Sequence, residues 1–93
     1  MLALARALML DPQVLLLDEP SASLSPKMVW LIFEKIKEIN QAGTAILIVE
    51  QNAREALSLS HRGYVLAMGE NRLEGEAKSL LENEEVGRLY LGA

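Results

Sequence analysis

The 93-residue sequence contains no cysteine and no long uninterrupted apolar run. Without cysteine there is neither a disulfide framework nor a thiolate metal site, which fits a reducing compartment. No apolar run approaches the roughly 20 residues that a membrane-spanning helix needs. The amino-terminal stretch MLALARALML is interrupted by Arg6, and we interpret it as a helix of the fold and not as a signal peptide.

Basic residues are also in short supply. Thirteen acids stand against 9 bases, which gives a net charge of −4. A nucleic-acid partner needs a basic face on the protein, so we expect no nucleic-acid binding. The hydrophobic share of 51% excludes a disordered acidic tail. The length suits one small domain or a portion of a larger one.

Two aliphatic runs, residues 14–17 and 45–49, contain no alternating polar residues. Such runs between turn signals indicate strands buried on both faces of a parallel sheet. Between them, Ser25 and Pro26 have the residue types of a helix N-cap and first helical position. The sequence therefore predicts a right-handed strand–helix–strand crossover.

The remaining segments alternate between helix-forming and strand-forming residues. Gly69 is expected in the turn of a hairpin. Two parallel strands are too few to cover such a sheet, so we expect partner strands outside this sequence. The fold class is α/β, with parallel strands, flanking helices and a carboxy-terminal β-hairpin. The expected helices are 1–10, 53–60, 77–82 and 84–91, and the expected hairpin strands are 63–68 and 71–74.

Polar side chains follow both aliphatic strands. Asp18 and Glu19 end the first strand, and Gln51 follows the second. Ligands of parallel sheets bind at the carboxyl ends of the strands. Adjacent carboxylates repel each other unless a cation is near, and a magnesium–phosphate ligand supplies that charge. We therefore predict that Asp18 holds Mg²⁺ through its waters and that Glu19 orients or polarises an attacking water.

Simpler interpretations of these residues stay open. The acid pair can merely begin a solvated loop, with Glu19 an ordinary surface acid. Gln51 can cap the next helix or lie in solvent. We favour the functional interpretation because Gln51 ends a strand on the same predicted edge as Glu19.

Three motifs of this chain resemble those of the nucleotide-binding subunit of ATP-binding cassette (ABC) transporters. VLLLDEP resembles the Walker B strand, SASLSP the D-loop, and AILIVEQN the switch strand with its loop. The resemblance implies a P-loop NTPase (RecA-like) fold that uses ATP and Mg²⁺, with Asp18 as the magnesium acid and Glu19 as the catalytic carboxylate. It places Gln51 where most of the family has histidine. Glutamine can hydrogen-bond the γ-phosphate but cannot become cationic.

The resemblance also implies partners. Ser21, Ala22, Ser23 and Leu24 occupy the D-loop, which in the family couples two nucleotide sites across a dimer with a second ATP-binding subunit. Ser23 and Ser25 depart from the commonest forms of that loop. Further implied partners are membrane-spanning permease subunits, with a cytoplasmic location on the inner face of the plasma membrane. VEQN, RGYVLAMGENRLEGEAKSLL and YLG are typical of the second ATPase of branched-chain amino-acid importers.

Two other motifs of the family are absent from the sequence. It has neither a signature loop nor the Gly-x-x-x-x-Gly-Lys-Ser/Thr (Walker A) loop that cradles phosphates; Gly87 and Gly92 have the spacing, but Ala93 follows. We therefore expect residues 1–93 to be the carboxy-terminal portion of a single ABC-type nucleotide-binding domain that is inactive alone. The alternatives are part of another P-loop ATPase, or an inert or dimerising fragment from a truncated reading frame.

Overall fold

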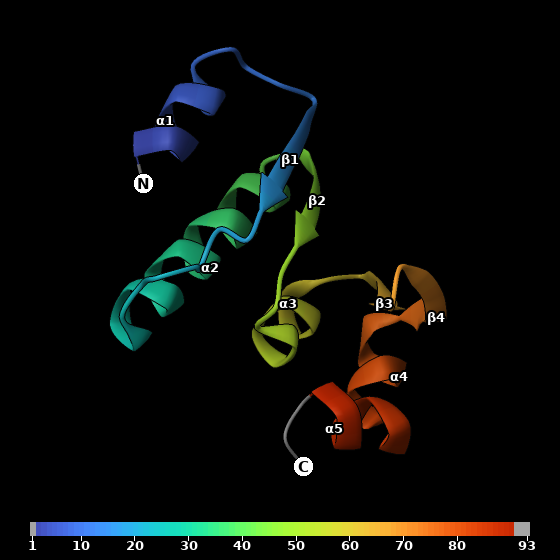
Figure 1. Ribbon diagram of the computed structural model, residues 1–93. Coiled ribbons are helices and arrows are strands. Elements are labelled where there is room, and N and C mark those ends of the chain that lie inside the picture. The colour runs from blue at the N-terminus through green and yellow to red at the C-terminus, as the bar shows by residue number, and fades with distance from the viewer. Residues whose placement is uncertain (1, 91–93) are drawn as a thin grey trace. The chain divides into compact units, whose positions relative to one another are not determined.

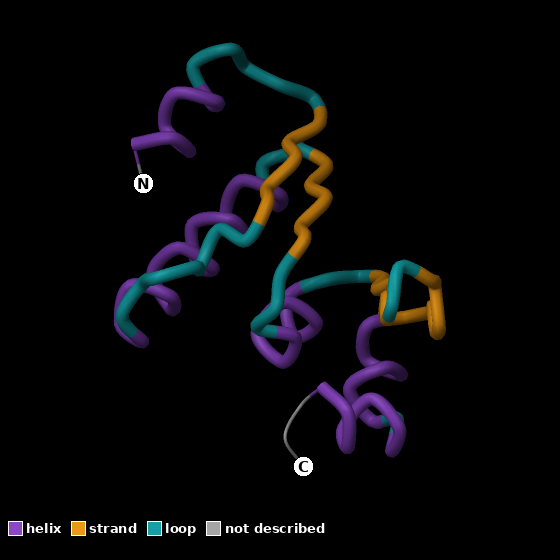
Figure 2. Tube along the Cα trace, viewed as in Figure 1, coloured by secondary structure: helices purple, strands orange, loops and turns teal. Residues whose placement is uncertain are grey.

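A computed structural model describes residues 2–90, and the chain divides into two compact units, residues 1–51 and 52–93. The α/β class expected from the sequence is confirmed (Figures 1 and 2). No helix within residues 2–90 has the length and apolar character needed to cross a membrane. The first unit contains α1 (Leu2–Leu8), β1 (Val14–Asp18), α2 (Pro26–Gln41) and β2 (Ala45–Val49); the second contains α3 (Ala53–Leu59), β3 (Arg62–Ala67), β4 (Glu70–Glu76), α4 (Ala77–Glu82) and α5 (Glu84–Tyr90).

The first unit is built on the parallel pair β1–β2. Its register runs from Val14 opposite Ala45 to Asp18 opposite Val49, and α2 connects the two strands. The helix begins where the sequence predicts, because the Met28 N–H donates a hydrogen bond to Ser25 Oγ at 3.3 Å. The expected strand–helix–strand arrangement of parallel strands is therefore confirmed.

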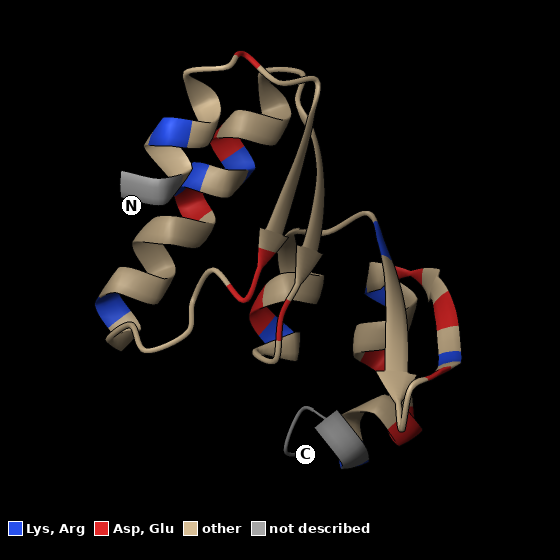
Figure 3. Cartoon of the chain, turned by 45° about the horizontal axis from the view of Figure 1, so that its top comes forward, with Lys and Arg blue, Asp and Glu red and all other residues tan. Residues whose placement is uncertain are grey.

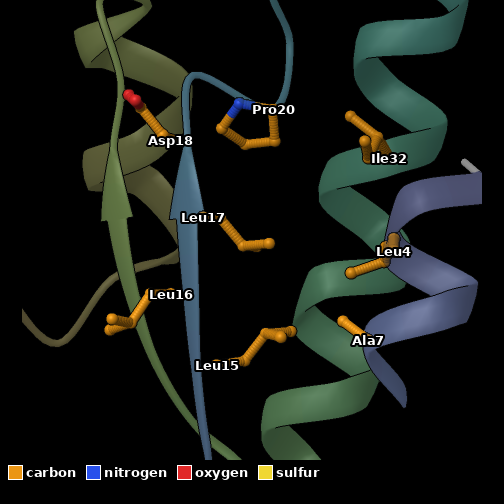
Figure 4. A pocket seen from close by; sticks show the side chains of 8 residues that line it. All are labelled: Leu4, Ala7, Leu15, Leu16, Leu17, Asp18, Pro20 and Ile32. Atoms are coloured by element: carbon orange, nitrogen blue, oxygen red, sulfur yellow. The ribbon is translucent and has the colours of Figure 1, made fainter. Parts of the chain in front are cut away.

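Only one face of this strand pair is covered within the described residues. Leu15 is 5% exposed, whereas its neighbour Leu16 is 70% exposed. Figure 4 shows Leu15 and Leu17 directed toward α1 and α2, and Leu16 and Asp18 directed to the opposite side. The expectation of burial on both faces is wrong, because alternate side chains of a strand point to opposite faces and the helices pack on one. We call the other face the open sheet face; its apolar members are Val14, Leu16, Ala45, Leu47 and Val49.

The second unit packs short helices against the antiparallel hairpin β3–β4. The turn expected at Gly69 is observed, but Met68, expected at the end of the first hairpin strand, lies in that turn because β3 ends at Ala67. Met68 and Gly69 both have positive φ (54° and 76°), as a type I′ turn requires. A bulge between Val65 and Leu66 shifts the register of the hairpin. The buried residues of this unit include Ala77, Leu80 and Val86, which belong to α4 and α5.

Candidate functional site

The residues that follow β1 and β2 lie at the same edge of the strand pair. Asp18 is paired with Val49, and the Glu19 N–H donates a hydrogen bond to the Val49 carbonyl oxygen at 2.6 Å. Gln51 comes two residues after Val49, and all three polar residues are exposed. Acidic residues stand at the ends of β1 and β2 (Figure 3). The structure thus brings Asp18, Glu19 and Gln51 to one edge, while their chemical roles stay predictions.

The loop after β1 has an unusual backbone. Glu19 and Ser23 have φ values of 47° and 64°, in the left-handed region that non-glycine residues rarely occupy. The Ala22 N–H donates to the Glu19 carbonyl oxygen at 3.1 Å, which forms a tight turn directly after the strand. Such backbone strain costs on the order of 1–3 kcal/mol and gathers at functional sites. The turn therefore fixes the backbone of Glu19 directly after the end of β1.

Glu50 is a member of this edge that the sequence interpretation missed. Its Oε2 accepts a hydrogen bond from the Ser21 N–H at 3.2 Å, and its Oε1 accepts one from the Gln51 N–H at 3.1 Å. Ser21 is buried, and a buried backbone N–H is costly unless it donates a hydrogen bond, so the Glu50 carboxylate supplies the acceptor that the Ser21 amide needs. The sequence does place Glu50 at this edge. Glu50 comes directly after β2, just as Glu19 comes directly after β1.

The carboxylates of this edge fit a magnesium ion that is bound together with phosphates. Within residues 2–90, no group of three or more His, Asp or Glu side chains is placed to hold a metal ion. Mg²⁺ in nucleotide sites usually takes one or two carboxylates, with waters and substrate phosphates completing its shell. The exposed carboxylate of Asp18 suits that mode of binding.

A pocket of about 310 Å³ lies beside the edge within the first unit, but it does not suit a phosphate. Its lining is almost wholly aliphatic, and Asp18 points away from the helices that wall it (Figure 4). We therefore interpret it as a gap in the packing of α1 and α2 on β1. The lining residues are Leu4, Ala7, Leu15, Leu16, Leu17, Asp18, Pro20 and Ile32.

No protein-family model matches the chain, but curated proteins match it over nearly its whole length. It is 46% identical over 92 residues to the high-affinity branched-chain amino acid transport ATP-binding protein BraG of Pseudomonas aeruginosa. It is 43% identical over 93 residues to a probable branched-chain amino acid transport ATP-binding protein of Archaeoglobus fulgidus. This chain is a relative of ABC transporter ATP-binding proteins. A lipopolysaccharide export ATP-binding protein of Escherichia coli is 37% identical over 89 residues.

Solved structures of ABC ATP-binding proteins share the fold of this chain. The ADP conformation of MJ1267, an ATP-binding cassette, gives a TM-score of 0.77 at 31% identity and covers 97% of the chain. CbiO1 of Clostridium perfringens, part of the transporter complex CbiONQ, gives 0.79 at 31% identity and covers 92%. The chain spans 40% and 39% of the two branched-chain relatives and 37% and 35% of these structures. The predicted P-loop NTPase fold and the family resemblance are confirmed.

Proposed function

We propose that Asp18, Glu19 and Gln51 form the hydrolytic edge of an ATP site in an ABC-transporter subunit. The observation that carries the proposal is the parallel pairing of β1 with β2, which puts Glu19 and Gln51 at one edge. The relatives at 46% and 43% identity are named for branched-chain amino acids, and the lipopolysaccharide relative is less similar at 37%. We therefore propose that the whole protein drives import of branched-chain or similar hydrophobic amino acids.

Each polar residue of the edge has a distinct role in this proposal. Asp18 offers a carboxylate to the waters around Mg²⁺, which, when bound with the phosphates, neutralises their charge. Glu19 accepts a hydrogen bond from the attacking water, orients it and takes its proton. Gln51 donates an amide N–H to a γ-phosphate oxygen and stays neutral throughout.

The proposal extends to partners and location. The loop formed by residues 21–24 lies at an interface with a second ATP-binding subunit. It couples the nucleotide site of one subunit to that of the other. ATP hydrolysis changes the conformation of the two ATP-binding subunits. Membrane-spanning permease subunits bind them at the cytoplasmic face of the plasma membrane and couple this change to transport. One of the similar structures, CbiO1, is part of an ABC transporter complex, which supports a permease partner for this chain as well.

The residues that cradle the phosphates come, in this proposal, from outside the 93-residue sequence. The sequence has no Gly-x-x-x-x-Gly-Lys-Ser/Thr loop to supply backbone amides and a lysine to the β- and γ-phosphates. We therefore expect the 93-residue chain alone to hydrolyse no ATP above background. A magnesium-dependent turnover that Glu19→Gln abolishes would contradict this expectation.

A chimera tests the proposed function directly. The chain replaces the matching segment of the Pseudomonas aeruginosa relative, and ATP hydrolysis is measured with and without Mg²⁺. Glu19→Gln should lower kcat by about 100-fold or more with KM for ATP nearly unchanged, because a general base contributes about 10²–10⁴-fold. Glu38→Gln is the matched control, because Glu38 is an exposed acid of α2 paired with Lys35 at 3.4 Å. An inactive chimera beside an active intact relative refutes the proposal.

A further inference from the structure

We propose that Glu50 is a positioning residue that fixes the spacing between the loops after β1 and β2. One oxygen of its carboxylate accepts from the Ser21 N–H at 3.2 Å, and the other accepts from the Gln51 N–H at 3.1 Å. We call this pair of hydrogen bonds the Glu50 clamp. The inference rests on the proposed function of Glu19 and Gln51, because it assigns Glu50 the role of holding those two residues at a fixed position relative to each other.

The chemistry of the clamp calls for a carboxylate. Each of the two loops presents a backbone N–H, and an ionised carboxylate has two oxygens that only accept. Hydrogen bonds to an ionised acceptor are stronger than those between neutral groups. Ser21 is 29 residues from Glu50 along the chain, so this hydrogen bond connects the loop after β1 to the loop after β2.

The clamp acts on both proposed catalytic groups through the backbone of the two loops. Ser21 follows Glu19 by two residues, and the intervening turn is closed by the Ala22 N–H bond to the Glu19 carbonyl oxygen at 3.1 Å. Holding the Ser21 amide therefore holds the turn in which Glu19 keeps its left-handed φ of 47°. Gln51 is tied directly through its own amide. A displacement of about 1 Å between reacting groups can cost on the order of 100-fold in rate, so small shifts of these loops matter.

Amide hydrogen exchange on the ¹⁵N-labelled 93-residue chain tests the clamp without any catalytic assay. Glu50→Ala should speed exchange of the Ser21 amide by about tenfold or more, because the lost bond is to a charged acceptor. Glu50→Gln should give a smaller change, because its single amide oxygen still accepts one bond. Glu38→Gln makes the same change of charge on α2 and should leave the Ser21 amide unchanged. Unaltered exchange of Ser21 in Glu50→Ala overturns the clamp.

The chimera described above separates positioning from mere structural support. Glu50→Ala should lower kcat by about 10- to 100-fold at nearly constant KM for ATP. The melting temperature should fall only slightly, because the clamp contributes two hydrogen bonds to the fold. Glu50→Gln should recover part of that loss, and Glu38→Gln should match the unsubstituted chimera. An unchanged kcat in Glu50→Ala overturns the inference. So does a parallel fall of kcat and melting temperature that Glu50→Gln does not relieve.

The two experiments also separate this inference from the proposed function. An unsubstituted chimera without ATPase activity refutes the proposed function, and the exchange rate of the Ser21 amide then decides the clamp alone. An active chimera whose kcat is insensitive to Glu50→Ala refutes the positioning role and leaves the proposed function standing.

Discussion

Two neighbouring leucines of β1 test which face of the strand pair is covered. Leu15 is 5% exposed and Leu16 is 70% exposed. Replacing a buried leucine with alanine costs about 2–5 kcal/mol, and the cost is lowest where neighbouring side chains can move into the space that is left. Leu15 lines the 310 Å³ pocket, so we expect Leu15→Ala to cost about 2–3 kcal/mol. Leu16→Ala should cost about 0.5–1 kcal/mol, because most of its side chain already contacts water.

Urea unfolding of the 93-residue chain measures this difference. Trp30 is the only tryptophan and lies in α2, so its fluorescence reports the first unit. With a slope of about 1 kcal/mol per molar urea, Leu15→Ala should lower the midpoint by about 2 M or more, enough to unfold a small unit outright. Leu16→Ala should lower it by less than about 1 M.

Equal losses in the two variants, or a larger loss in Leu16→Ala, would show that the open sheet face is covered in solution. In that case the one-sided burial of β1 would not describe the molecule.

Three further variants probe local features. Gly63→Ala should destabilise the second unit by about 1–3 kcal/mol, since a Cβ there would lie 2.6 Å from Leu57 Cδ2 and 2.8 Å from Leu80 Cδ1; an unchanged melting temperature contradicts this close packing. Met68→Asn should stabilise the hairpin by about 0.5–1 kcal/mol, because asparagine tolerates positive φ and Met68 is 99% exposed. Faster amide exchange in β3 and β4 of this variant would argue against the type I′ turn. Ser25→Ala should cost about 0.5–2 kcal/mol through loss of the α2 cap, and helical circular dichroism during urea unfolding should show an earlier transition; coincident curves would exclude that cap.

Most elements could be predicted because their signals are local. The Ser25-Pro26 pair sets the beginning of α2, as the capping bond to Met28 confirms. The helix expected over 77–82 has the observed bounds Ala77–Glu82, and the helix expected over 84–91 is seen as Glu84–Tyr90, with residue 91 outside the described part. The helix expected over 1–10 is described as Leu2–Leu8, with Met1 outside that part as well.

The position of the polar residues of the candidate site could be predicted, but the hydrogen bonds and the backbone conformation around them could not. The placement of Asp18, Glu19 and Gln51 at one edge follows from two parallel strands that end there, and their chemical roles stay predictions. The place of Glu50 directly after the second strand could be seen in the sequence, but its hydrogen bond to the Ser21 N–H could not, because Ser21 is 29 residues away. The positive φ of Glu19 was equally hidden, since glycine is the usual signal for that conformation.

The sequence by itself determined the order of helices and strands, the parallel pairing and the edge at which the polar residues gather. Aliphatic runs, caps and turn residues act over a few positions, so they can be interpreted without the fold. Only the tertiary structure decided that β1 is buried on one face, that Gly63 is closely packed, and that Glu50 joins two loops. These features depend on contacts between residues far apart in sequence, which exist only after the strands have paired and the helices have packed.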